Sequence, residues 1–127
     1  MLGVSGVSSD SRDIETAFNE GNDRAILTSY LYARIVAKFI GSYFVELGGV
    51  DAIAFTAGVG ENASYLRKMI IDEISEALHV VLDEAKNNER KKENRIISTA
   101  DSKVDIMIIP TNEEVMIARD TVKLLEL

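Results

Sequence analysis

The feature that most constrains the fold is a long stretch of helical periodicity, Asn22–Leu47. Apolar residues recur there every three or four positions, and Gly48-Gly49 provides a stop, so we predict one long helix. A second apolar row covers another face of this helix: Leu27, Leu31, Ile35, Phe39 and Tyr43. We therefore expect the helix to be buried on more than one side, either at the centre of the fold or against another chain.

Strand-like and helical segments alternate along the rest of the chain, which indicates an α/β domain. An apolar run rich in β-formers, Asp51–Thr56, is followed by a glycine turn over Gly58–Asn62 and by helical periodicity over Ser64–Leu78. The other expected segments are a loop over Gly3–Arg12, a short helix over Asp13–Asn19, a short strand over Val80–Leu82, a charged surface loop over Asp83–Asn94, strands over Arg95–Thr99 and Val104–Ile109, and a last helix capped by Asn112.

The composition matches one soluble domain and excludes several function classes. The 127 residues are 46% hydrophobic, which is enough for a single core. The absence of cysteine excludes disulfides, thiol catalysis and thiolate metal sites, and the net charge of −7 argues against general affinity for nucleic acid. Charged residues interrupt the most apolar region, so we expect no membrane span, no signal peptide and a cytoplasmic location. His79, the single histidine, is expected to be structural.

A glycine-containing segment, Phe55–Asn62, leaves the predicted strand and enters the predicted helix. Glycine lets the backbone approach a ligand closely, and ligands of open α/β sheets lie beyond the carboxyl ends of the strands. The segment is neither a P-loop nor a dinucleotide fingerprint, because it has no Gly-Lys-Ser/Thr and lacks the glycine spacing of the latter. Taken alone, it fits a nucleotide-binding loop or an ordinary structural turn.

Charged residues in two other segments are candidates for a phosphate or metal site. Asp10 and Arg12 lie in a serine-rich stretch and could bind the ribose or phosphates of a nucleotide, although these residues taken alone favour a surface ion pair with capping serines. Thr111–Glu114 follows a predicted strand and Pro110, where a carboxylate can bind magnesium. Helix capping explains the same acidic residues, since carboxylates are favourable in a first helical turn.

Three segments together resemble the acetate kinase family in their order and spacing: Ser5–Asp13, Phe55–Asn62 and Ile109–Glu114. Ile97–Val104 and Ile117–Thr121 extend the similarity over essentially the whole chain. The resemblance implies a ribonuclease-H-like domain of the acetate and sugar kinase, Hsp70 and actin superfamily. Residues 1–127 would be part of the second, carboxy-terminal nucleotide-binding domain, with the amino-terminal domain absent.

The resemblance also implies site residues and cofactors. The nucleotide, ATP or ADP, would contact Asp10, Ser11, Arg12 and the adenosine-side loop formed by Gly58, Val59, Gly60, Glu61 and Asn62. Glu113 would be the carboxylate associated with Mg²⁺. No catalytic residue is assigned to this chain, because the acetate pocket and the catalytic residues of the family lie in preceding sequence.

The reaction implied is reversible transfer of the γ-phosphoryl group of ATP to acetate, giving acetyl phosphate and ADP. We expect the chain alone to be inactive and acetate to bind only in the intact enzyme. The family dimerises through its second domain, so a homodimer is also implied. The alternatives are a propionate kinase fragment and a stand-alone nucleotide-binding or dimerisation module.

Overall fold

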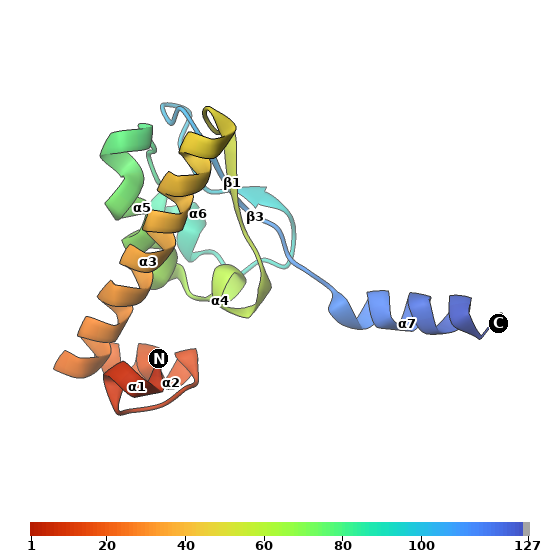
Figure 1. Cartoon of the computed structure of the whole chain (residues 1–127), viewed down its shortest axis with the longest axis horizontal. Coiled ribbons are helices and arrows are strands. Elements are labelled where there is room, and N and C mark those ends of the chain that lie inside the picture. The colour runs from red at the N-terminus through yellow and green to blue at the C-terminus, as the bar shows by residue number, and fades with distance from the viewer. Residues whose placement is uncertain (126–127) are drawn as a thin grey trace.

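The computed structural model describes residues 1–125 and contains seven helices and three strands within them (Figure 1). The helices are α1 (Leu2–Ser5), α2 (Ser11–Asn19), α3 (Asp23–Leu47), α4 (Ala57–Asn62), α5 (Ser64–Leu78), α6 (Glu84–Asn88) and α7 (Glu113–Leu124). The strands are β1 (Ala52–Phe55), β2 (Arg95–Ile96) and β3 (Asp105–Ile108). The α/β class predicted from the sequence is confirmed.

The strands form one mixed sheet with the order β1-β3-β2. β1 and β3 are parallel, and their register runs from Ala52 opposite Asp105 to Phe55 opposite Ile108. β2 joins the other edge of β3 in the antiparallel sense. The carboxyl end of β1, which leads into α4, therefore lies beside the carboxyl end of β3, which leads towards α7.

The long helix α3 agrees with the prediction from the sequence. The Asn22 side chain caps it by accepting hydrogen bonds from the amides of Arg24 and Ala25, and Gly48 ends it with a φ of 70°, in the left-handed region. One face of α3 packs against α5, and α1 and α2 pack against its amino-terminal end (Figure 1). The second apolar row is exposed, so burial on more than one side is not found within the described residues.

The main core lies between the sheet and the helices α3 and α5. Ile97 and Ile106 are completely buried there, together with Ile71 and Ile108 at 1% exposure. A smaller cluster around Ile14 joins α2 to the start of α3. Burying such aliphatic side chains stabilises the fold by about 1.5–3 kcal/mol each. This packing fixes α5 and β1, the two elements on either side of α4.

Five predicted segments differ from the structure. Leu2–Ser5 is a short helix and not a loop, and α2 begins at Ser11 because Asp10 caps it. The predicted strands at Val80–Leu82 and Arg95–Thr99 are reduced to one bridge, Leu82 opposite Ser98, and to the two residues of β2. The Ser98 hydroxyl accepts from the Ile106 amide and so replaces a ladder hydrogen bond. The predicted charged loop contains α6, which Asp83 caps.

The last described helix, α7, projects away from the rest of the molecule (Figure 1). All of its residues are exposed, including the apolar Val115, Ile117 and Leu124. Within residues 1–125, no helix is both long enough and apolar enough to cross a membrane.

Candidate functional site

A cavity of about 1260 Å³ brings together the three segments that the sequence analysis singled out. Its lining includes residues from all three: Ser11 and Arg12, then Gly58, Val59, Glu61 and Asn62, then Thr111, Asn112 and Glu114. Three other predicted site residues, Asp10, Gly60 and Glu113, do not line it. The parallel pairing of β1 with β3 brings the second and third segments together, because it places the ends of both strands at one edge of the sheet.

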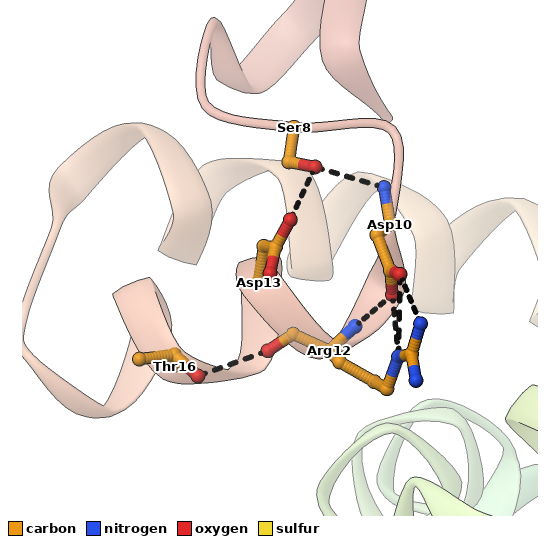
Figure 2. A network of polar contacts seen from close by, with 5 residues as sticks. All are labelled: Ser8, Asp10, Arg12, Asp13 and Thr16. Carbon is orange, nitrogen blue, oxygen red and sulfur yellow. Dashed lines mark hydrogen bonds and ion pairs between the residues drawn. The ribbon is translucent and has the colours of Figure 1, made fainter.

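Asp10 forms an exposed ion pair with Arg12 (Figure 2), and Arg12 lines the cavity. The Arg12 Nε donates to both carboxylate oxygens at 3.1 and 3.2 Å, and its Nη2 donates to Oδ2 at 2.6 Å. The same carboxylate caps α2 by accepting from the Arg12 amide, and Ser8 bonds to the Asp10 amide. The hydrogen bonds from Arg12 lower the pKa of Asp10 to about 2. The surface ion pair with a capping serine is therefore present, and the Arg12 side chain remains 86% exposed.

The glycine segment after β1 is the helical turn α4, so the prediction of a non-helical exit turn was wrong. Gly60 lies close against the backbone of Phe55, because a Cβ added at Gly60 would be 3.2 Å from the backbone carbonyl carbon of Phe55. A Cβ added at Gly58 would meet nothing within 4 Å. Ala57, the first residue of α4, has a φ of 57°, which is unfavourable for a residue with a side chain. Such strain persists only where the surrounding structure imposes it.

Glu61 connects α4 to the segment that follows β3. Its Oε1 accepts hydrogen bonds from the amide of Thr111 at 2.9 Å and from the Thr111 hydroxyl at 3.2 Å. Asn62 donates to the carbonyl of Gly58 at 2.8 Å and closes the short helix on itself. Glu61 thus joins two of the predicted segments through its own side chain.

Arg67 and Asn87 also line the cavity, and the sequence analysis assigned neither of them to the site. Arg67 lies on α5 and donates to the carbonyl of Gly60 and to Asn87. A signal was present in the sequence, because position 67 lies four residues after Ala63 and three before Ile70, on the buried face of α5. A charged residue on the buried face of a helix indicates a side chain that makes specific polar contacts in the interior.

The acidic residues before α7 are arranged as helix capping requires. Asn112 accepts from the Val115 amide at 3.0 Å, and Glu113 and Glu114 occupy the first turn of the helix. Glu114 lines the cavity and Glu113 lies beside it in the chain. Throughout residues 1–125, no group of three or more histidine, cysteine, aspartate or glutamate side chains is placed to hold a metal ion.

The cavity has more cationic than acidic side chains, in contrast to the chain as a whole. The cationic residues are Arg12, Arg67, Arg90, Lys91, Lys92 and Arg95, and the acidic ones are Glu15, Glu61, Glu89 and Glu114. The basic run at residues 90–92, which the sequence analysis left without a function, forms part of this wall. A cavity whose charged side chains are mostly cationic attracts anionic ligands.

Comparison with known proteins gives a consistent result. The sequence matches the Acetokinase family over residues 1–119. It is 56% identical to an acetate kinase of Caldanaerobacter subterraneus subsp. tengcongensis over 127 residues, which are 99% of this chain and 31% of that protein.

Solved structures show the same likeness. The chain resembles Porphyromonas gingivalis acetate kinase with a TM-score of 0.83 and 43% identity, over 98% of this chain and 31% of the other. A propionate kinase from Francisella tularensis gives a TM-score of 0.80 and 37% identity, over 92% and 29% of the two chains. The chain therefore has the fold of one part of these enzymes and spans about a third of their length.

Proposed function

Because this chain belongs to the acetokinase family, we propose that it forms the nucleotide side of an enzyme that transfers the γ-phosphoryl group of ATP to acetate. The reaction is reversible and gives acetyl phosphate and ADP. Since the chain spans 31% of its relative's length, we propose that it contributes to the site and does not catalyse the reaction alone.

The observation that carries this proposal is the convergence of three separate segments on one cavity. Each segment alone fits an ordinary cap or turn, and the family match adds a common role for them. Residues more than forty positions apart in the sequence meet there, as the hydrogen bonds between Glu61 and Thr111 illustrate. A volume of about 1260 Å³ accommodates a nucleotide, since ligand pockets commonly measure about 300–1,000 Å³.

The cavity residues suit different parts of a nucleotide. We assign Asp10, Ser11 and Arg12 to the ribose and phosphates, because the exposed Arg12 guanidinium has donors beyond those it gives to Asp10. We assign Gly58–Asn62 to the adenosine side, where Gly58 leaves open space beside the backbone. The cationic wall supplies attraction for the phosphate charge, which the overall charge of −7 does not.

Magnesium would accompany the nucleotide in this proposal. Mg²⁺ is commonly bound by one or two carboxylates together with substrate phosphates, so a single carboxylate from this chain fits that donor set. We propose Glu113 for this role, with Glu114 beside it on the cavity wall. When bound, the metal neutralises charge on the phosphate oxygens, and the residues of this chain orient the nucleotide against it.

The acceptor has a second candidate, propionate. The fold is shared with an acetate kinase and with a propionate kinase, and both cover nearly all of this chain. Comparing kcat/KM for acetate and propionate in the intact enzyme decides between them. A higher value for propionate would replace acetate in the proposal and leave the nucleotide assignments unchanged.

We also propose that the intact enzyme is a cytoplasmic homodimer, without affinity for nucleic acid. The apolar row on α3 supports the dimer, because Leu27, Ile35 and Phe39 are 48%, 54% and 60% exposed in the single chain. Sedimentation of the intact enzyme measures its oligomeric state. A monomer at micromolar concentration would contradict the dimer.

The central test uses matched variants of the intact enzyme, Glu113→Gln and Glu114→Gln. Both carboxylates occupy the first turn of α7, so each loses a similar helix-dipole contact of about 0.3–1 kcal/mol. Only Glu113→Gln is expected to reduce magnesium-dependent turnover strongly, because misplacing a catalytic metal costs several kcal/mol of transition-state stabilisation, on the order of a hundredfold in rate. Equal, near-wild-type turnover of both variants would remove Glu113 from the metal site.

A second measurement tests whether the chain alone catalyses the reaction. The 127-residue chain and the intact enzyme are assayed with ATP, acetate and magnesium, and acetyl phosphate is detected as its hydroxamate. We expect product only from the intact enzyme, because a site with one wall cannot hold both reactants in line. Turnover by the chain alone would require a complete active site within it.

A further inference from the structure

Arg67 is a buried cation with no carboxylate partner. Only 2% of the residue is exposed, and no acidic group lies within ion-pair distance of it among the described residues. Its Nε donates to Oδ1 of Asn87 at 2.8 Å, its Nη2 to the Asn87 carbonyl at 2.6 Å, and its Nη1 to the Gly60 carbonyl at 2.8 Å. All of these acceptors are neutral.

This arrangement is unfavourable for stability alone. Burying a charge without an opposite charge costs several kcal/mol, and an apolar side chain of similar volume often gives a more stable protein. Burial and the nearby charge of Arg95 lower the pKa of Arg67 to about 10. The hydrogen bonds that the guanidinium makes are therefore the property that distinguishes arginine from an apolar residue here.

Those hydrogen bonds connect α4 with α6. The Gly60 carbonyl belongs to α4, and Asn87 belongs to α6 and also donates to the Ser64 carbonyl at 3.0 Å. On its other side α4 is bound through Glu61 to Thr111. The six residues of α4, which begin at the strained Ala57, are thus held from two directions.

We propose that Arg67 is a positioning residue for the nucleotide, acting through α4 and not by touching the ligand. The inference rests on the proposed function, which assigns Gly58–Asn62 to the adenosine side. Although Arg67 borders the cavity, only 2% of the residue is exposed, so it offers almost no surface to a ligand and its effect is expected to pass through the Gly60 carbonyl. The planar guanidinium donates in several fixed directions at once, which a lysine ammonium on a flexible stem does not.

The test compares Arg67→Lys and Arg67→Gln with Lys68→Gln in the intact enzyme. Lys68 is the neighbouring residue on α5, and it is exposed and paired with Asp72 and Glu84, so its variant removes the same charge without touching α4. Measured for each are kcat, the KM for ATP and for the acceptor, and amide exchange over residues 58–63.

We expect both Arg67 variants to raise the KM for ATP by about tenfold to a hundredfold, the scale of a displacement of about 1 Å. The KM for the acceptor should stay unchanged, and the amides of 58–63 should exchange faster. Lys68→Gln should match the wild type. If the Arg67 variants do not fold, Asn87→Ala gives a milder form of the test, because it removes one acceptor and leaves the guanidinium in place.

Two results would overturn the inference. A wild-type KM for ATP in Arg67→Lys would mean that the positive charge, and not the geometry of the guanidinium, is what nucleotide binding requires. An unchanged KM for ATP in every variant with faster amide exchange over residues 58–63 would mean that the position of α4 does not affect nucleotide binding. Failure of the wild-type enzyme to bind ATP would instead refute the proposed function. The two failures are therefore distinguishable.

Discussion

Gly58 and Gly60 lie two positions apart in α4, and replacing each with alanine should change the stability of the protein to different extents. A Cβ at Gly60 would lie 3.2 Å from the carbonyl carbon of Phe55, closer than ordinary van der Waals contact. That carbon cannot move freely, because the Phe55 carbonyl accepts from the Ile109 amide at 2.9 Å. A Cβ at Gly58 would meet nothing within 4 Å.

The expected difference in the free energy of unfolding follows from comparing the two variants with each other. Alanine is favoured over glycine in a helix by about 1 kcal/mol, and this gain applies to both and cancels in the comparison. The overpacking against Phe55 applies only to Gly60→Ala and costs about 1–3 kcal/mol. Gly60→Ala should therefore be less stable than Gly58→Ala by about 1–3 kcal/mol.

The assay is native-state amide exchange at Asp105 and Ile109, whose amides donate to the carbonyls of Asp51, immediately before β1, and of Phe55, at its end. Their opening free energy should fall in Gly60→Ala relative to Gly58→Ala. The KM for ATP in the intact enzyme should rise in Gly58→Ala if the added methyl group occupies space in the cavity, which Gly58 lines. Equal exchange in the two variants would refute the claim that Gly60 is required for packing on β1.

Three further outcomes are expected. Glu61→Ala should accelerate exchange of the Thr111 amide by about fivefold or more, because a hydrogen bond to a charged acceptor is lost; unchanged exchange would contradict the connection. Arg12 lowers the pKa of Asp10 to about 2, so the stabilisation from this pair is present above pH 3.8 and is lost as the pH falls through about 2. Carboxyl NMR should follow that titration, and Arg12→Gln should move the midpoint up towards 3.8, whereas an unmoved midpoint would rule out the ion pair as its cause. Asn22→Ala should destabilise α3 by about 1 kcal/mol, measured as faster exchange of the Arg24 and Ala25 amides.

The sequence predicted the secondary structure correctly where apolar periodicity and helix-capping residues agree. The bounds of α3 and α5 follow from apolar periodicity, and Asn22 and Gly48 mark the two ends of α3 with side-chain and backbone chemistry that acts locally. The family resemblance and its fold were likewise confirmed, because three spaced segments agree at once. The order of β1 and α5, with a glycine-containing connection between them, also needed no information from distant residues.

The remaining features depend on partners that are far apart in the sequence. The two glycines of α4 predicted a turn from the sequence. The helix is instead associated with contacts to distant residues, namely its packing on Phe55 and the hydrogen bond from Arg67 to the Gly60 carbonyl. Asn87 lies in a polar stretch and gave no sign of burial, yet it is 2% exposed because Arg67 reaches it. A side chain's burial is set by the residue it meets, and single-sequence patterns do not record that partner.

The parallel pairing of β1 with β3 also has a kinetic consequence. Helices such as α3 and α5 form from local contacts, whereas the ladder from Ala52 opposite Asp105 must close a long intervening loop before it gains any stabilisation. We therefore expect this pairing to form late in folding. Two of the segments that line the cavity follow β1 and β3, so we expect the complete cavity to be absent from early intermediates and to form in the same slow step that completes the sheet.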